Sequence, residues 1–279
     1  MSDKIIFKDF DRLVPMFKDR WNPIYLEYGR LEVDNYSVKF ISSENEIIKI
    51  PVAMLSCIIL GPGTTITHAA IISCSRSNTP IIWCGDDGLN FYSFGVTTNE
   101  SCKISSRHVE MFSSNENKLI VSRRMFKIRF PDIDCSDLDI CSMRGMEGNR
   151  VKTLYKEFAD KYDIPWVCRN TNGIFGVDVD DLNMSLNVLN YNLYCICLSV
   201  ILSMGFIPSL GFFHSDGKIP FVYDIADLYK KELTIDTAFY CFVKCKKFNK
   251  EFLAQEFSKR VSEFKLLEKL PKHLNGIFK

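Results

Sequence analysis

Three residues in the last third of the chain carry side chains that bind divalent cations: His214, Asp224 and Asp227. The two aspartates are three residues apart at the start of a segment with helical spacing, so they lie on nearly the same face. Two carboxylates on one face repel each other unless a cation lies between them. Carboxylates prefer Mg²⁺ or Mn²⁺, and an imidazole nitrogen makes Mn²⁺ easy to accept. The pattern therefore predicts a magnesium or manganese site.

Each of these residues also has an ordinary structural role open to it. Asp224 could cap a helix, and a single histidine in a loop is more often structural than a ligand. Asp227 could pair with Lys230 or Lys231. The three residues together favour the metal site more than any one of them favours its structural role.

A fourth acidic residue, Glu147, is expected on the inward face of a helix. The stripe that contains it continues with the apolar residues Val151, Leu154 and Phe158. Burying a carboxylate is costly unless a cation, a metal ion or hydrogen bonds compensate. Arg144 and Arg150 lie three residues before and after Glu147 and could be its partners. The sequence leaves open whether Glu147 forms a structural ion pair or belongs to the site.

The elements that must position these residues change character along the chain. The first part has short alternating runs separated by turn signals, which predict an antiparallel sheet. Strands are expected at residues 24–28, 31–34, 37–41, 47–50, 55–60 and 80–84. Thr67 can cap a short helix between the last two strands. The glycine-rich residues 61–65 before it match no nucleotide-binding pattern and are interpreted as a structural turn.

Helical spacing replaces strand spacing after residue 107. Helices are expected at residues 123–129, 138–161, 181–204, 224–230 and 236–269. The sequence therefore predicts an α+β protein with an N-terminal antiparallel β domain and a larger all-α C-terminal domain. The expected boundaries are residues 1–96 for the β domain, 97–106 for a linker and 107–279 for the helical catalytic domain.

The composition is that of a globular protein: 279 residues, 47% hydrophobic and 25% charged. The net charge of +1, from 35 basic and 34 acidic residues, provides no overall basic field that would favour nucleic acid. Charge is nevertheless segregated, because residues 103–130 hold seven basic and two acidic residues and residues 244–279 hold ten and four. These stretches could bind phosphates or could be solvated helix faces.

Cysteine usage and hydropathy predict a cytoplasmic protein. The eleven cysteines include no Cys-x-x-Cys pair and no signal peptide is recognised, so we interpret the cysteines as buried small hydrophobic residues in a reducing compartment. Residues 182–215 have no charged side chain and are long enough to span a membrane. Asparagines in the first half, breakers such as Pro208 in the second and the lack of flanking positive charge favour a buried central helix instead.

Three segments in order resemble the CRISPR-associated spacer integrase family, specifically its type I-E branch. They are residues 61–70 (GPGTTITHAA), residues 144–148 (RGMEG) and residues 214–227 (HSDGKIPFVYDIAD). The resemblance is in register from about Asp19 to the last quarter of the chain. It implies a β domain followed by a helical domain, in agreement with the element pattern. It also implies a metal-dependent DNA endonuclease and integrase that inserts captured foreign DNA into a CRISPR array by transesterification with a DNA 3′-hydroxyl.

The resemblance assigns roles to individual residues. It implies metal ligands at Glu147, His214 and Asp227, with Asp224 as a further catalytic acid. Tyr28 matches the position whose ring braces the fork of a splayed DNA end, although by sequence alone it is a strand residue that could equally be core. Apart from the resemblance, the basic stretch makes Arg123, Arg124 and Lys127 the first candidates for phosphate contacts, and Arg144, Arg150 and Lys218 are also expected to bind DNA.

The partners that the resemblance implies are DNA and protein. They are double-stranded DNA with 3′ ends, CRISPR repeat DNA, a second copy of the chain in a homodimer, and the second CRISPR adaptation protein, a small ferredoxin-like subunit that completes a heterohexamer. Two other functions remain open at this point: a general metal-dependent DNA nuclease outside CRISPR, and a catalytically inactive subunit that binds DNA as an architectural protein.

Overall fold

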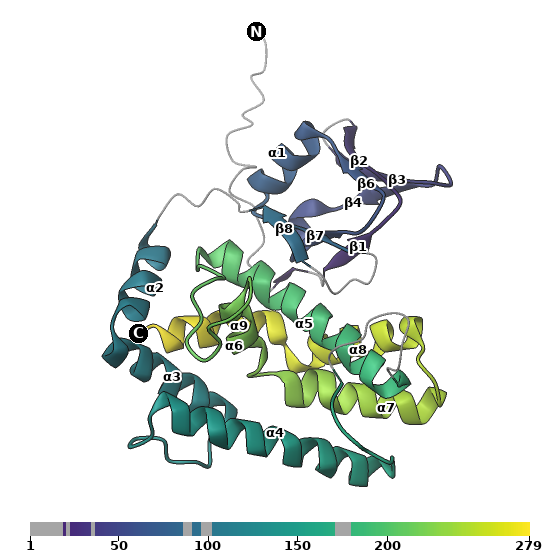
Figure 1. Cartoon of the computed structure of the whole chain (residues 1–279). Helices are drawn as coiled ribbons and strands as arrows, with labels where there is room; N and C mark the ends of the chain where they lie inside the picture. The colour runs from purple at the N-terminus through teal and green to yellow at the C-terminus, as the bar shows by residue number, and fades with distance from the viewer. Residues whose placement is uncertain (1–18, 21–22, 35–36, 86–90, 96–101, 171–179) are drawn as a thin grey trace.

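The computed structural model describes residues 19–20, 23–34, 37–85, 91–95, 102–170 and 180–279. Strands make up the first part of the chain and helices the rest, with the β region stacked against one side of the helical region (Figure 1). The expected α+β architecture, a β part followed by a larger α part, is confirmed.

The β region consists of two four-stranded sheets of mixed direction. The first has the order β1 (Ile24–Leu26), β5 (Ile58–Leu60), β7 (Ile81–Cys84) and β8 (Phe91–Gly95), and the second has the order β4 (Ile47–Ile50), β3 (Ser37–Ser42), β2 (Gly29–Asp34) and β6 (Thr64–Ile66). Strands β1, β5 and β7 are parallel to one another, and β6 is parallel to β2. The predicted antiparallel pairing is confirmed for β2 with β3, β3 with β4 and β7 with β8, and it is wrong for the parallel pairs β1–β5, β5–β7 and β2–β6.

The reason for the mixed pairing is that β1 and β2 enter different sheets. Tyr28 separates them with a left-handed backbone (φ 50°), and its N–H donates to Pro62 O at 2.9 Å. The whole β2–β4 meander and the 3₁₀ turn η3 (Val52–Met54) then form the crossover that a parallel β1–β5 pair requires. Tyr28, expected in a strand, is instead a turn residue.

Helix α1 (His68–Arg76) begins as predicted. The Thr67 side chain accepts a hydrogen bond from Ala70 N at 3.3 Å, which is the expected N-cap. The turn before it is closed by Thr64 Oγ1, which donates to Gly61 O at 2.7 Å, and Gly63 has a φ of 66°. The interpretation as a structural turn agrees with these contacts for residues 61–63, but it is wrong for Thr64 and Thr65, which lie in strand β6 and pair with β2.

The helical region is built from eight α-helices and one π-helical turn in the part of the chain described. They are α2 (Lys103–Ser113), α3 (Asn115–Arg129), α4 (Ile140–Tyr162), α5 (Asp181–Met204), α6 (Pro220–Ala226), η4 (the π-helical turn Lys231–Ile235), α7 (Asp236–Cys245), α8 (Lys250–Phe264) and α9 (Leu266–Ile277). Since α2 begins at Lys103, residues 103–106 of the expected linker are helical, and residues 96–101 lie outside the described residues.

Three helix predictions need correction. The helix expected at residues 123–129 begins at Asn115, where the Ser114 side chain caps it by accepting from Asn117 N. The helix expected at residues 224–230 begins at Pro220 and ends at Ala226, because the proline occupies the first helical position, where its missing N–H is not needed. The single helix expected at residues 236–269 is three helices. Lys246 (φ 59°) ends α7 and Lys265 (φ 56°) ends α8, because each adopts a left-handed conformation that turns the chain before the next helix.

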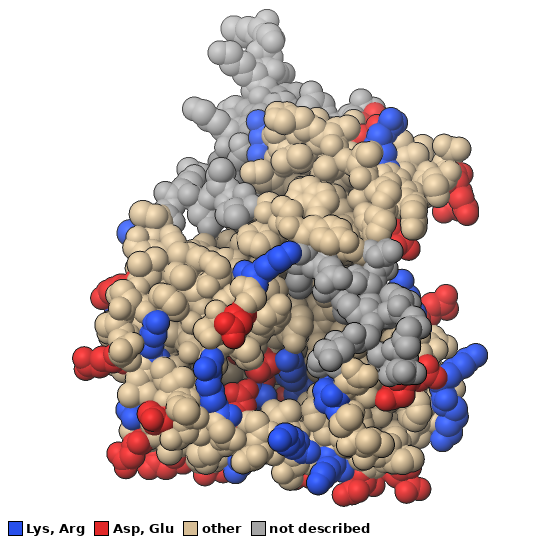
Figure 2. All heavy atoms as spheres, viewed as in Figure 1, with Lys and Arg blue, Asp and Glu red and all other residues tan. Residues whose placement is uncertain are grey.

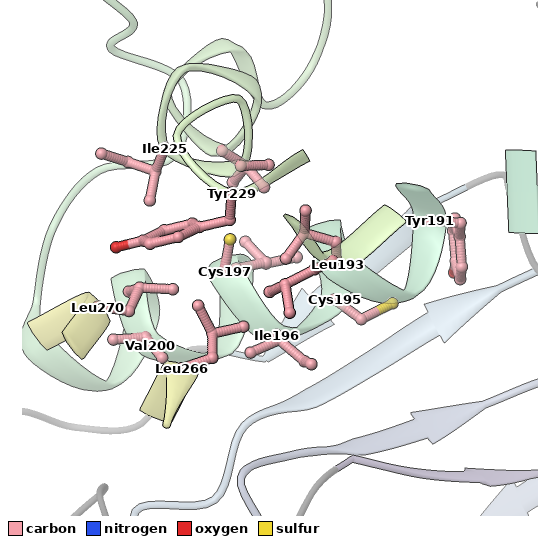
Figure 3. Packing of buried hydrophobic residues seen from close by; sticks show 14 of the residues in the cluster. Tyr191, Leu193, Cys195, Ile196, Cys197, Val200, Ile225, Tyr229, Leu266 and Leu270 are labelled. Atoms are coloured by element: carbon pink, nitrogen blue, oxygen red, sulfur yellow. The ribbon is translucent and has the colours of Figure 1, made fainter. Parts of the chain in front are cut away.

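Helix α5 lies in the centre of the helical region. It is long and apolar enough to cross a membrane, but 83% of its most apolar stretch is buried inside the protein, as predicted. Figure 3 shows its apolar side chains, among them Leu193, Ile196 and Val200, packed near Tyr229 and Leu270. The first sheet packs into the same core. It contributes four side chains from its strands and the residues next to them: Cys57, Ile59, Ile82 and Cys84.

The cysteines are reduced throughout the described residues, and most are buried. Cys102, Cys141 and Cys168 are exposed, so for these three the prediction of a buried position is wrong. The buried thiols pack as small apolar groups, because burial disfavours the thiolate and raises the pKa of residues such as Cys57 and Cys195.

Candidate active site

A cleft of about 1250 Å³ opens in the helical region between the end of α3, residues 144–157 of α4 and residues 213–235. Figure 2 shows the hollow, where acidic atoms lie beside Lys and Arg atoms. Glu147, His214 and Asp227 all line it, although they come from distant points in the chain. Asp224 joins these three in the wall of a smaller recess within the site. The fold thus brings together all four predicted catalytic residues.

Asp224 fastens the loop that carries His214. Its side chain is 0% exposed and lies inside α6 rather than at a helix cap, so the capping role considered for it is wrong. Oδ2 accepts hydrogen bonds from the backbone N–H groups of Phe212 (2.5 Å) and Phe213 (3.1 Å). Oδ1 accepts from His214 N (2.8 Å) and is paired with His214 Nδ1 (2.8 Å).

These four contacts occupy both oxygens of Asp224. A metal ion could reach this carboxylate only by replacing some of them, so the geometry gives Asp224 a positioning role. Because Nδ1 of His214 donates to the carboxylate, its proton is held there and Nε2 keeps the lone pair that can bind a cation.

Glu147 and Asp227 face each other across one guanidinium group. Arg129, the last residue of α3, donates through Nη1 to both Glu147 and Asp227 Oδ2, the latter at 3.3 Å. Lys230 Nζ lies 2.6 Å from Asp227 Oδ1, which confirms one of the two pairings considered for Asp227. The side chains of Glu147, Asp227 and Arg129 are only 16%, 11% and 14% exposed. The inward orientation of Glu147 agrees with the helical stripe, but its partner is Arg129 and not Arg144 or Arg150.

The electrostatics of the two carboxylates differ. Burial raises the pKa of Glu147, and the charge of Asp227 adds to this rise while Arg129 opposes it. Burial also disfavours ionised Asp227, but Lys230 and Arg129 outweigh that effect and lower its pKa. The hydrogen bond to Asp224 raises the pKa of His214 against the opposing effect of burial. The charge of the carboxylate pair therefore depends on nearby cations.

The donor set suits the divalent cation that the resemblance implies. Two carboxylates and an imidazole from three elements line one recess, and buried Asp227 Oδ1 has no hydrogen bond of good geometry despite its proximity to Lys230. Among the described residues, no three His, Cys, Asp or Glu side chains lie close enough together to coordinate one metal ion. Arg129 Nη1 contacts both carboxylates instead. The residues fit Mg²⁺ or Mn²⁺.

His108 holds the backbone of the segment that precedes His214. It is 0% exposed, and its Nε2 lies 2.9 Å from Leu210 O while Ile207 N donates to Nδ1 at 3.2 Å. Nδ1 must therefore accept, and Nε2 must carry the proton. These two bonds hold residues 205–213, which lead into His214. The His108 ring packs against the rings of Phe206, Phe212, Phe221 and Phe278.

Three residues predicted to bind DNA contact backbone carbonyls of their own chain. Arg123 donates to Leu138 O through Nε (3.1 Å) and Nη2 (2.9 Å), and Lys127 donates to Ile133 O at 3.3 Å. Arg124 donates to Ile277 O at 2.8 Å, which ties the end of α9 to α3. Figure 1 places the C-terminus beside α2 and α3 accordingly. The geometry gives these side chains structural contacts, and their DNA contacts stay a prediction.

The other predicted DNA-binding residues occupy different surfaces. Arg144 and Arg150 are exposed and line the cleft, and the Arg150 guanidinium lies 5.3 Å from the centre of the Phe130 ring. Lys218 is exposed in the loop after His214 but does not line the cleft. Tyr28 is 54% exposed in the β region, so it is not a core residue.

Arg129 is the residue that sequence analysis did not place in the site. It was visible only as one of seven cations in residues 103–130. The available signal was that a buried carboxylate pair needs a cation, but the chain separates Arg129 from Asp227 by 98 residues. No local spacing connects the two.

A cleft in which two carboxylates and an imidazole lie beside Arg and Lys side chains is compatible with metal-assisted chemistry on a phosphodiester. The family model described as "CRISPR associated protein Cas1" matches residues 24–134 and 127–273. The chain belongs to this family, which confirms the resemblance at family level. The type I-E branch stays a prediction.

Relatives and solved structures agree with this assignment. The chain is 39% identical to CRISPR-associated endonuclease Cas1 2 of Chlorobaculum tepidum, over 96% of this chain and 90% of that protein. It is 30% identical to CRISPR-associated endonuclease Cas1 of Escherichia coli, over 80% of this chain and 73% of that protein. The crystal structure of the TtCas1–DNA complex is similar with a TM-score of 0.81 and 28% identity, covering 92% of this chain and 91% of that chain.

Proposed function

We propose that this chain is a Mg²⁺- or Mn²⁺-dependent DNA endonuclease and integrase that inserts captured DNA into a CRISPR array. The observation that carries the proposal is that Glu147, His214 and Asp227 all line one cleft of a Cas1-family chain. Family membership and the endonuclease names of the relatives support action on DNA.

The proposed reaction joins a DNA 3′-hydroxyl to a phosphodiester at the repeat boundary and releases another 3′-hydroxyl. A bound divalent cation would stabilise the negative charge that develops on the phosphate and on the attacking and leaving oxygens. Glu147, Asp227 and His214 Nε2 would hold this cation. Asp224 would keep the His214 ring in the orientation and tautomer that leave Nε2 available.

The remaining residues of the cleft would hold DNA. Arg144 and Arg150 are exposed on the α4 side of the cleft and would contact phosphates, which positions a duplex without reading its sequence. Lys218 and Tyr28, on other exposed parts of the surface, would meet DNA outside the cleft. The TtCas1–DNA complex supports a DNA-bound state for a chain with this fold.

The assembly is proposed from the family alone. Two homodimers would be held by the second CRISPR adaptation protein in a heterohexamer that binds double-stranded DNA with 3′ ends and CRISPR repeat DNA. The cytoplasm is the proposed location, since that is where an array and its captured DNA meet.

The test uses isosteric substitutions, because an amide removes the negative charge but keeps the size of the side chain and an oxygen that can accept from Arg129. Glu147→Gln and Asp227→Asn should abolish 3′-end joining and weaken Mn²⁺ binding while DNA binding remains. Glu157→Gln is the matched control, since Glu157 is an exposed carboxylate on the same helix and lines the same cleft. Cutting without joining in the wild type would favour the general nuclease, and DNA binding with neither reaction would favour the architectural subunit.

DNA affinity should also depend steeply on salt. If several phosphates are neutralised, the logarithm of the binding constant should fall linearly with the logarithm of salt concentration between about 50 and 200 mM. A flat response would reject phosphate binding by the cleft margin. Filter binding or fluorescence anisotropy with unrelated duplexes measures it.

A further inference from the structure

Arg129 occupies the position that a shared cation would need. Its Nη1 contacts one oxygen of Glu147 and Oδ2 of Asp227, so one nitrogen bridges carboxylates that come from α4 and from the end of α6. The guanidinium carbon also lies 5.3 Å from the centre of the neighbouring Phe130 ring, which supports the side chain from another direction. Within the described residues, no other Lys or Arg forms an ion pair with Glu147.

We propose that Arg129 is an internal counter-ion of the active site: it holds Glu147 and Asp227 together in the metal-free protein, and a divalent cation binds only by exchanging with it. This inference rests on the metal site proposed above. It adds that the site has its own competitor, built from this chain, so the affinity for metal is lower than the three ligands alone would provide.

Charge supports exchange rather than joint occupancy. Glu147 and Asp227 contribute two negative charges, and Arg129 and Lys230 contribute two positive ones, so the group is neutral as it stands. Adding a divalent cation to this neutral group would place two uncompensated charges among side chains that are at most 21% exposed, which a poorly solvated site disfavours. Release of Arg129 removes one of them. A guanidinium stays charged at any relevant pH, so Arg129 can leave only by moving.

Geometry leads to the same conclusion. A cation that bridges Glu147 and Asp227 through the oxygens that face each other meets Arg129 Nη1, which contacts one oxygen of each, and two cations cannot share that position. Lys230 lies on the other oxygen of Asp227, Oδ1, so it is not between the two carboxylates.

The test compares Arg129→Gln with Arg150→Gln by Mn²⁺ titration calorimetry on the full chain. Arg150 is the matched control, because it lies at the same 5.3 Å from the Phe130 ring and lines the same cleft but forms no ion pair with Glu147 or Asp227. Arg129→Gln should bind Mn²⁺ roughly ten- to a hundredfold more tightly than wild type, the range expected for losing contacts to a charged group. Arg150→Gln should change the affinity by less than about fivefold, as for an exposed charge.

Thermal unfolding provides a second measurement that does not need activity. Without metal, Arg129→Gln should melt below wild type, because Glu147 then lacks its counter-ion and Asp227 keeps only Lys230. Saturating Mn²⁺ should raise its melting temperature by more than it raises that of wild type, since no internal cation has to leave. Arg129→Lys keeps the charge without the planar fork, so it should fold and bind Mn²⁺ with an affinity between those of wild type and Arg129→Gln.

Two results would overturn the exchange in different ways. If wild type binds Mn²⁺ and folded Arg129→Gln and Arg129→Lys bind it no more tightly, Arg129 does not compete and only this inference fails. If neither wild type nor any variant binds Mn²⁺, the proposed metal site fails and the exchange with it.

Discussion

The substitution Asp224→Asn tests how the histidine of the site is held. The amide replaces one acceptor oxygen by an NH₂ group that donates. If the NH₂ lies at the Oδ2 position, it faces the N–H groups of Phe212 and Phe213, and both hydrogen bonds are lost. If it lies at the Oδ1 position, it loses the backbone N–H of His214 but can donate to Nδ1, provided that the ring proton moves to Nε2.

Each arrangement has a measurable consequence. A hydrogen bond to a charged group contributes about 1.5–3 kcal/mol, and the substitution loses one or two of them, so the free energy of unfolding should fall by about 2–5 kcal/mol. A proton on Nε2 also removes the lone pair of His214 that would bind metal. Loss of such a positioning contact usually weakens metal binding by about 10–100-fold, and Glu147 and Asp227 should keep the remaining Mn²⁺ affinity measurable.

Urea denaturation and Mn²⁺ calorimetry at neutral pH measure the two effects. Asp216→Asn is the control, because Asp216 is an exposed carboxylate in the same loop and lines the same cleft. An Asp224→Asn protein whose unfolding free energy lies within about 0.5 kcal/mol of wild type, and whose Mn²⁺ affinity is unchanged, would refute the positioning role of Asp224.

Further predictions concern the parts that support the site. Burial lowers the pKa of His108 to about 4, so the unfolded chain binds this proton at a higher pH than the folded chain. The unfolding free energy of wild type should therefore fall by roughly 3 kcal/mol between about pH 6.5 and pH 4. Urea denaturation of His108→Gln over the same pH range should lack this contribution. Arg124→Met removes the bond to Ile277 O and should lower the unfolding free energy by about 1–3 kcal/mol. Weaker DNA binding by Arg124→Met at unchanged stability would instead support a phosphate contact. Gly63→Ala would place a Cβ 2.6 Å from Tyr28 Cδ1 at a φ of 66°, so calorimetry should show a loss of about 1–2 kcal/mol, whereas wild-type stability would contradict the strained turn.

The sequence by itself determined the type of most elements and several of their ends. Helix α5 begins and ends at the predicted residues, because Asp180 caps its start through Asn183 N and Gly205 ends it in the left-handed region. Thr67 caps α1 as predicted. These features depend on neighbours within a few positions, so spacing and residue type are sufficient to predict them. Type, spacing and resemblance also predicted the four residues Glu147, His214, Asp224 and Asp227, which the fold brings into one recess.

Tertiary structure decided which of these groups touch one another. The parallel pairing of β1 with β5, the carbonyl contact of Arg124 and the position of Arg129 between two carboxylates join residues 18 to 153 positions apart. Local spacing contains no information about such pairs, because a cation or a strand edge can be satisfied by many partners. Burial selects among them: a carboxylate removed from water must find a counter-charge, and only the folded chain determines that Arg129 is the group close enough to provide it.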